Sequence, residues 1–287
     1  MASALLRNGE KVRALVRNPD APRARALAAA GATLVVGDLE DLSSLTPALE
    51  GARGVFSVQL PDFEDDALEV RLATNLAQAA QKARVEHIVH TSVSGTGTVH
   101  PTDEARWGQH WVHYWQSKQG AEQAVRDAGF RYTTIFRPST YMDNFIYPSI
   151  NYYYPEGNPH LVVTGMDPDS PQPWISLDDF GADVATAFAN PARFDGIELE
   201  LASDIKSFRE AVAIISEALD REVRLPADRA EAEAAGLTPL LAKAHEYISL
   251  YPLPAKPEFA KALGLPTTSF KDWAHTTLRQ KDGAAKK

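Results

Sequence analysis

Tyr114 and Lys118 have the spacing Y-x-x-x-K within the segment WVHYWQSKQGAEQAVRDAG. The segment is expected to be a long helix, and residues four apart lie on the same face of a helix. A lysine in that place lowers the pKa of the phenol electrostatically and can bind a ribose hydroxyl, so the tyrosine can exchange a proton with a carbonyl or alcohol during hydride transfer. Ser92 or Ser94, which follow the strand EHIVHT, could orient the same substrate oxygen. An ordinary surface pair of Lys118 with Glu122 is the alternative interpretation.

A second group of candidates follows the first two expected strands. Arg13 and Arg17 lie on and just after the strand KVRALVR, and Asp38 ends the strand ATLVVGD. In a dinucleotide-binding fold, an acidic residue at the end of the second strand binds the ribose 2′-hydroxyl, whereas an arginine suits a 2′-phosphate. The arginines therefore favour NADP(H) over NAD(H), and Asp38 could reach the adenine. A solvated arginine at a strand end and an aspartate that caps the next helix are the alternatives.

A third group lies in RPSTYMDN, after the strand RYTTIF. Pro138 stops the strand's hydrogen-bond ladder and turns the chain across the carboxyl edge of the sheet, where ligands bind in such folds. Asn144 could bond a ligand or satisfy the backbone of its own turn. By contrast, Gly95-x-Gly97 lacks the third glycine and the immediate helix of a phosphate-binding loop. The two histidines of HWVHYW have no carboxylate cluster beside them, so no metal is expected.

The candidate residues above are positioned by strands and helices. In the sequence, strand and helix patterns alternate through residue 139. This order predicts an α/β fold with a parallel sheet wound by right-handed crossovers. The continuous apolar run in ATLVVGD predicts a strand buried on both faces. The second half is more irregular, and its aromatic stretch Tyr147 to Tyr154 is expected to form part of a substrate wall. We therefore expect a nucleotide-binding domain over residues 1–145 and a smaller α+β lobe over 146–287.

Composition narrows the classes of function. The 287 residues carry a net charge of −9, which disfavours nucleic acid and anionic membrane as partners. There is no cysteine, which excludes disulfides, thiol catalysis and thiolate metal sites. No apolar run approaches the roughly 20 residues that span a bilayer, and the first residues lack the apolar core of a secretory signal. A cytoplasmic protein that acts on a small molecule is the expectation.

Taken together, these segments resemble the NmrA-like family of atypical short-chain dehydrogenase/reductase relatives. The blocks that carry the resemblance are VRALVRNP, GATLVVGDLEDLSSLTPALEGARGVFSV, HIVHTSVSG, SKQGAEQAVRDAGFRYTTIFRPSTYMDN and FAKALGLPTTSFKDWAHTTL, in that order. The resemblance implies a Rossmann-like, doubly wound parallel sheet that binds NADP(H), with a smaller C-terminal lobe over the cofactor. It also implies the following contacts: Arg17 with the 2′-phosphate, Asp38 with the adenine, Gln59 beside the pyrophosphate, Lys118 with the nicotinamide ribose, and Pro138 to Asn144 at the nicotinamide end.

The chain departs from the family pattern at its beginning. The family starts with a strand and the motif G-x-x-G-x-x-G, whereas this sequence starts within the helix that follows them. Roughly fifteen residues of the pattern are absent, including a strand that is central in the order 3-2-1-4-5-6. We therefore expect a sheet without its first strand and without the backbone amides that hold the pyrophosphate. A misassigned start codon and a truncated chain that binds cofactor poorly are the two explanations, and the otherwise complete set of cofactor-facing residues favours the first.

Three functions follow as hypotheses. Many family members keep the lysine but lack the tyrosine and act as nucleotide-sensing regulators, so Tyr114 favours an NADPH-dependent reductase of a small carbonyl, quinone or enone. Catalysis would then use Tyr114, Lys118 and Ser92. The alternative is a non-catalytic sensor of NADP(H) or NAD(H) that acts through protein partners. The third is an interaction protein without a cofactor.

Overall fold

The computed structural model describes residues 1–62, 64–98, 102–147 and 152–285. These residues form two compact units, each built from several stretches of chain. The first unit comprises Met1–Val99, His113–Arg137 and Phe180–Leu199, and the second comprises His100–Val112, Pro138–Asp179 and Glu200–Lys287. The sequence predicted one boundary, after residue 145. The units differ from that prediction because residues 180–199 return to the first unit.

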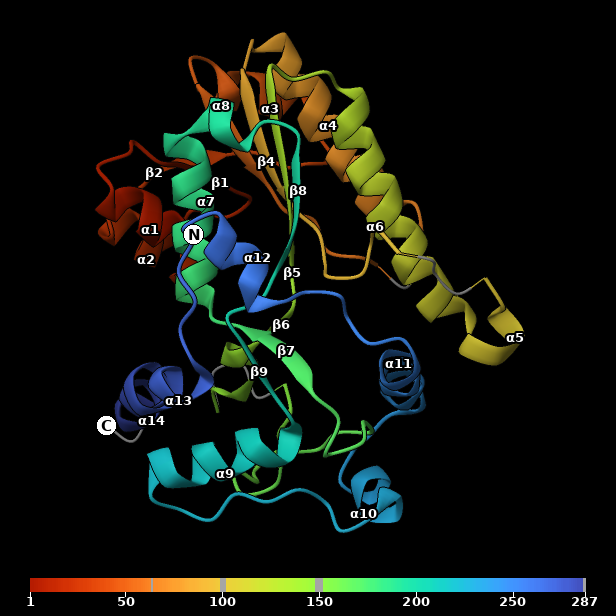
Figure 1. The fold of residues 1–287 in the computed structure, drawn as a ribbon. Helices are drawn as coiled ribbons and strands as arrows, with labels where there is room; N and C mark the ends of the chain where they lie inside the picture. Colours follow the sequence, from red (N-terminus) through yellow and green to blue (C-terminus); the bar gives the residue numbers. More distant parts are fainter. Residues whose placement is uncertain (63, 99–101, 148–151, 286–287) are drawn as a thin grey trace. The chain divides into compact units, whose positions relative to one another are not determined.

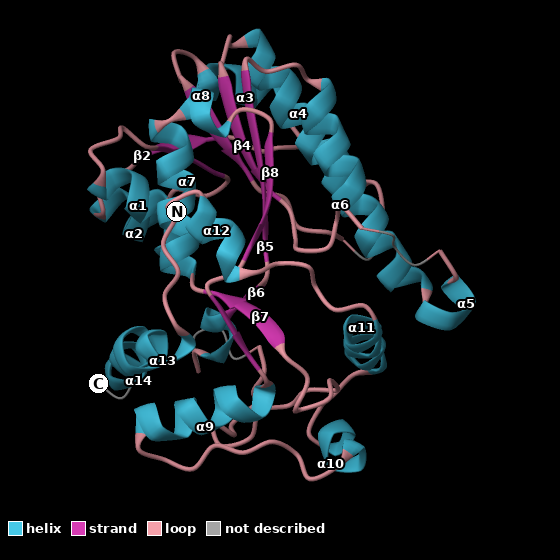
Figure 2. Ribbon diagram, viewed as in Figure 1, coloured by secondary structure: helices cyan, strands magenta, loops and turns pink. Residues whose placement is uncertain are grey.

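The first unit contains an alternation of strands and helices (Figures 1 and 2). Four of its elements, α6, β5, α7 and β8, have ends that belong to the second unit. The elements are α1 (Ala2–Arg7), β1 (Arg13–Val16), α2 (Pro22–Ala29), β2 (Thr33–Val36), α3 (Leu42–Leu49), β3 (Gly54–Ser57), α4 (Leu68–Lys82), β4 (His87–Thr91), α6 (Gln109–Asp127), β5 (Tyr132–Pro138), α7 (Leu177–Ala189), α8 (Pro191–Phe194) and β8 (Ile197–Leu201).

The strands of this unit form two separate sheets. One has the order β3-β4-β5-β8, in which β3 pairs with β4 and β4 with β5, both in parallel. The other consists of β1 and β2, also parallel. The parallel pairings and the helical crossovers between them confirm the Rossmann-like fold class.

The two sheets meet side chain to side chain rather than through backbone hydrogen bonds. Leu15 of β1 packs against the same core cluster as Val55 of β3, and this cluster contains Leu45 and Leu49 of α3. No residue of β2 belongs to that cluster, so β1 is the strand that lies nearer to β3. In strand order the break therefore falls between β1 and β3, which is the position at which the sequence analysis expects a further strand.

Exposure at the end of β2 corrects one expectation. The run ATLVVGD predicts a strand buried on both faces, but Val36 is 61% exposed. The reason is its position: β2 hydrogen-bonds only β1 and ends a sheet of two strands, so little covers its carboxyl end. Val58, just after β3, is likewise 48% exposed.

Helices cover both faces of the sheet that starts with β3 (Figure 1). On one face, α3, α4 and the end of α6 supply the apolar cluster that buries Val55 and Ile88. On the other face, rings of α7 and α8 pack edge-on against the strands, as Phe180 does on Phe56 and Phe194 does on Phe136. This arrangement is the doubly wound one that the alternation predicts.

Local side chains and glycines mark the ends of these helices. The carboxylate of Asp41 accepts a hydrogen bond from the Ser43 amide and caps α3. The helix at Pro22 is followed by Gly31, whose φ of +103° favours glycine. In the second unit, Ser207 and Glu210 form both hydrogen bonds of a capping box on α9.

The second unit is mixed α and β. In its three-stranded sheet β6 pairs in parallel with β7, and β7 pairs antiparallel with β9. An aromatic core that includes Phe145, Trp174 and Phe208 packs against this sheet. Its elements are α5 (Glu104–Trp107), β6 (Thr140–Tyr141), a 3-10 helix (Met142–Phe145), β7 (Gln172–Ile175), β9 (Asp204–Lys206), α9 (Phe208–Leu219), α10 (Arg229–Ala234), α11 (Pro239–Leu250), α12 (Pro257–Ala262), α13 (Phe270–Trp273), a π-helix (Ala274–Leu278) and α14 (Arg279–Ala285).

Candidate functional site

Lys118 is buried in the first unit, where its charge meets a carboxylate from another helix. Its side chain is 8% exposed, and Nζ lies 2.6 Å from Oε1 of Glu69, whose side chain is 2% exposed. The same ammonium donates to the main-chain carbonyl of Gln59, at 3.4 Å. Glu69 belongs to the first turn of α4, and Gln59 follows β3. Lys118 therefore joins α4, α6 and the carboxyl end of β3.

A polar network continues from Gln59 into the sheet. The side-chain amide of Gln59 donates to the hydroxyl of Ser57, at 3.2 Å, and that hydroxyl lies 3.0 Å from Nδ1 of His90. Burial lowers the pKa of His90 to about 4, and the positive charge of Lys118 also acts in that direction. His90 is therefore neutral near pH 7, and it bonds the hydroxyl as an uncharged imidazole.

Tyr114 lies one turn before Lys118 on α6. Its ring centroid is 5.8 Å from Lys118 Nζ, within the range of a cation–π contact. The ring is half-buried and packs edge-on against Trp115, at 5.3 Å between centroids. The structure thus brings together the tyrosine and the lysine that the spacing singled out. The alternative interpretation, a surface pair of Lys118 with Glu122, is not what the structure shows: Lys118 forms a buried pair with Glu69.

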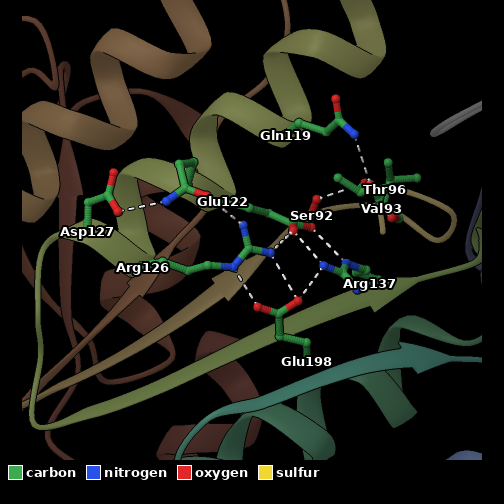
Figure 3. Close-up of polar contacts among 10 residues, drawn as sticks. Ser92, Val93, Thr96, Gln119, Glu122, Arg126, Asp127, Arg137 and Glu198 are labelled. Carbon is green, nitrogen blue, oxygen red and sulfur yellow. Dashed lines mark hydrogen bonds and ion pairs between the residues drawn. The ribbon is translucent and has the colours of Figure 1, made fainter. Parts of the chain in front are cut away.

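Glu122 belongs to a second network, which holds α6 to the sheet (Figure 3). Arg137 of β5 donates to both oxygens of this carboxylate, at 2.8 and 2.6 Å, and Arg126 donates to Oε2 at 2.6 Å. Both arginines also bond Glu198 of β8. Burial raises the pKa of Glu122, but hydrogen bonds from Arg137 and Ser92 outweigh it, so the pKa lies below its usual range.

Ser92 is part of this second network. Its hydroxyl hydrogen-bonds Glu122 and lies 3.1 Å from the hydroxyl of Thr96 (Figure 3). A cavity of about 460 Å³ opens beside these groups. Its lining consists of Thr96, Gly97, Gln119, Gly120, Glu122, Gln123, Arg126 and Arg137. In this structure the Ser92 hydroxyl is already engaged by the ion network. Its role in orienting a substrate oxygen stays a prediction.

The two arginines of the first strand have different surroundings. Arg13 donates to the carbonyls of Ala48 and Glu50, at 3.0 and 2.7 Å, and so satisfies the end of α3. Arg17 is exposed after β1, and in the described part of the chain it has neither a hydrogen bond nor an ion pair. Of the two, Arg17 is the one whose guanidinium is available for a ligand.

Asp38 follows β2 and supports its own turn. Its carboxylate accepts from the Glu40 amide at 3.0 Å, and its amide donates to the Ser44 hydroxyl, also at 3.0 Å. The cap of α3 is Asp41. The alternative of a helix-capping Asp38 is therefore wrong, and its contact with adenine stays a prediction.

The predicted residues Pro138 and Asn144 belong to the second unit, and their role at the nicotinamide end stays a prediction. The side chain of Asn144 hydrogen-bonds the hydroxyl of Tyr153, whose pKa burial raises. Tyr153 lies 3% exposed in the aromatic core, which identifies it as a packing residue rather than part of a substrate wall. Residues 148–151 of the predicted wall lie outside the described residues.

The described residues contain no group of three or more histidine, aspartate or glutamate side chains that could hold a metal ion. His113 instead pairs with Asp66, at 2.6 Å between Nδ1 and Oδ2. Within the same residues, no helix combines the length and the apolar character needed to cross a bilayer.

Sequence reasoning missed Glu69. A glutamate in the first turn of an amphipathic helix is usually a solvated residue that complements the helix dipole. One signal was available: Glu69 precedes Ala73, Leu76 and Ala80 of the buried stripe at helical spacing, so it occupies the core side of α4. A charged residue on that side requires a partner.

Comparisons with known proteins bear on the fold and the family. A family model described as the NmrA-like family matches residues 1–229. The NmrA-like family domain-containing oxidoreductase FrzB of Cladobotryum sp is 28% identical over 246 residues, which span 78% of this chain and 70% of that protein. The NAD(P)H azoreductase of Xenophilus azovorans is 27% identical over 282 residues, which span 91% of this chain and 87% of that protein.

Solved structures share the fold at lower identity. The triphenylmethane reductase of Citrobacter sp., complexed with NADP(H), has a TM-score of 0.75 and 20% identity over 96% of this chain and 94% of that one. NmrA, a negative transcriptional regulator solved in complex with NADP, has a TM-score of 0.74 and 22% identity, with coverage of 99% and 93%. These likenesses confirm the Rossmann-like architecture.

Proposed function

The chain belongs to the NmrA-like family, and from that premise we propose that it binds NADP(H) in preference to NAD(H) and reduces a small carbonyl, quinone or enone. The observation that carries the proposal is the pair on α6. Tyr114 supplies a phenol that can give a proton, and Lys118 supplies a buried positive charge 5.8 Å from its ring. This pair lies next to the carboxyl end of β3, the edge at which open parallel sheets bind ligands.

The residues present fit most parts of such a cofactor. A lysine ammonium has three donors, and Lys118 uses two of them on Glu69 and Gln59 in the described residues, which leaves one for a ribose hydroxyl. Arg17 has an exposed guanidinium after β1, where an arginine suits a 2′-phosphate. Asp38 ends the neighbouring strand and suits the adenine. Gln59, whose carbonyl accepts from Lys118, belongs to the segment proposed to lie beside the pyrophosphate.

The proposed chemistry is a proton transfer beside a hydride transfer. The nicotinamide, when bound, supplies the hydride to the substrate. Tyr114 gives its phenolic proton to the substrate oxygen on which negative charge develops. Lys118 stabilises the phenolate that remains, because opposite charges attract strongly where water is excluded. Its third donor orients the ribose.

Sensing is the second candidate function. NmrA is a negative transcriptional regulator that has been solved with NADP and with NAD. Lys118 is already neutralised by Glu69 in this structure, an arrangement that a nucleotide-binding regulator without catalysis could also use. In this case the partner would be another protein, and the oxidised and reduced nucleotides would bind with different affinities.

The test is NADPH oxidation by the 287-residue chain across a panel of carbonyls, quinones and enones. We expect turnover with at least one class and its loss in Tyr114→Phe. Binding of NADPH measured by calorimetry without turnover of any substrate, and unchanged in Tyr114→Phe, would favour the sensor. Absence of binding by any nicotinamide nucleotide would overturn both. The cytoplasmic location stays an expectation throughout.

A further inference from the structure

Both carboxylate oxygens of Glu69 accept hydrogen bonds from side chains of α6. Oε1 accepts from Lys118 Nζ at 2.6 Å, and Oε2 accepts from the Ser117 hydroxyl at 2.7 Å. The side chain is 2% exposed, so water does not share the interaction. A buried carboxylate with two donors on consecutive residues of one helix is held in a fixed place.

Lys118 depends on this carboxylate for its charge. In the described part of the chain, its one ion pair is with Glu69, and its other acceptor is the neutral carbonyl of Gln59. Burial penalises an ammonium unless an anion accompanies it. Without Glu69, the ammonium would be left with a carbonyl at 3.4 Å and the face of the Tyr114 ring.

The other ionisable groups around Lys118 do not replace Glu69. Glu122, one turn later on α6, is bonded by Arg126 and Arg137. His90 of β4 is neutral near pH 7, because burial lowers its pKa to about 4. Tyr114 contributes an aromatic face and an uncharged phenol. Among the residues that the structure describes, the carboxylate paired with Lys118 thus comes from α4.

We propose that Glu69 is the positioning residue of Lys118, which keeps the ammonium protonated and fixed between Tyr114 and the carboxyl end of β3. The consequence for a bound nucleotide rests on the proposed function, whereas the effect on the protonation of Lys118 does not. If Glu69 contributed to stability alone, the titration of Lys118 would be unchanged in a folded variant that lacks the Glu69 carboxylate.

The first measurement needs no nucleotide. The protein is produced with lysine labelled at the ε carbon, and the Lys118 signal is identified by its absence in Lys118→Met. We expect the titration midpoint of this signal in Glu69→Gln to lie at least about one unit below that of the wild type. Glu69→Asp retains the charge and should restore a midpoint close to that of the wild type.

Glu64→Gln is the matched control, since Glu64 is exposed on the segment before α4. Its Lys118 signal should behave as in the wild type. Circular dichroism first establishes which variants fold, and Glu69→Asp provides the comparison if Glu69→Gln does not fold. An unchanged Lys118 titration in folded Glu69→Gln, or a lowered midpoint in Glu69→Asp equal to that of the glutamine variant, would overturn the proposal.

The second measurement is the affinity for NADPH between about pH 6.5 and 9.5. Across this pH range the affinity of Glu69→Gln should fall at least about tenfold further than that of the wild type. A parallel pH profile in the two proteins would contradict the role toward the nucleotide. If the wild type binds no nucleotide, the proposed function fails, while the lysine titration still decides the role of Glu69.

Discussion

Lys118 and Glu122 lie one turn apart on α6, yet the ion networks around them are built differently. Glu122 shares two arginines with Glu198, and these planar guanidinium groups form paired hydrogen bonds that fix α6 to β5 and β8. Lys118 has a single carboxylate partner, and an ammonium is a point charge on a flexible stem. The arginine network around Glu122 therefore stabilises the fold, whereas the Lys118–Glu69 pair leaves one N–H donor of Lys118 for a ligand.

The largest expected effect lies in the arginine network. Arg137→Met leaves the buried carboxylate of Glu122 without its main partner, so the free energy of unfolding should fall by about 3–5 kcal/mol. Urea denaturation measures it. Arg131→Met is the control, because Arg131 pairs with Glu86 at an exposed position and should cost at most about 1 kcal/mol. Equal losses in the two variants would show that the buried arginine network contributes no more to stability than an exposed ion pair does.

The next effect concerns chemistry rather than stability. Tyr114→Phe removes the proposed proton donor and should lower kcat by about 10²–10⁴-fold. Because the ring and its packing on Trp115 remain, the free energy of unfolding should change by less than about 0.5 kcal/mol. Steady-state kinetics and urea denaturation together measure this separation. A variant that keeps full activity would show that the phenol is not the donor.

A third prediction uses the neutral imidazole next to the lysine network. The pKa of His90 is about 4 in the folded chain and near 6.5 when unfolded, so between these values the unfolded chain binds more protons. Stability therefore falls as the pH is lowered, by about 2 kcal/mol at pH 5 from this residue alone. His90→Gln should remove that part of the difference between pH 7 and pH 5. An unchanged difference would mean that His90 titrates normally.

The smallest effects distinguish the two arginines of β1. Arg17→Ala should weaken NADPH binding at least about tenfold, leave NADH binding unchanged and alter stability by less than about 0.5 kcal/mol. Arg13→Ala should instead cost about 1 kcal/mol of stability, through its bonds to the α3 carbonyls, with nucleotide affinity unchanged. Calorimetry and thermal unfolding of both variants test these expectations. If Arg13→Ala weakened NADPH binding and Arg17→Ala lowered stability instead, the roles of the two arginines would be exchanged.

Local patterns predicted the fold well because they act between near neighbours in the chain. The alternation of strands and helices and the same-face placement of Tyr114 and Lys118 both depend on residues within a few positions. The resemblance to a family supplied the strand order, and the parallel pairings agree with it.

Partners distant in sequence could not be predicted in the same way. Glu69 and Lys118 are 49 residues apart, and a glutamate on a helix carries no mark of which lysine it will meet. Arg13 was predicted as a cofactor ligand from its place on a strand, but its length lets it reach carbonyls 35 and 37 residues away. The aromatic residue Tyr153 was assigned to a substrate wall, although aromatic rings equally fill cores.

The separation of β1 and β2 from the larger sheet has a consequence for deuterium uptake. A ribbon of two strands has little cooperative strength of its own, and each of its strands lacks a ladder on one side among the described residues. Its amides should therefore exchange with solvent through a local opening, well before those of β4, which is paired on both sides and buried along its whole length. Proteolysis and aggregation would begin at the same place, because an open strand edge is a template for other chains.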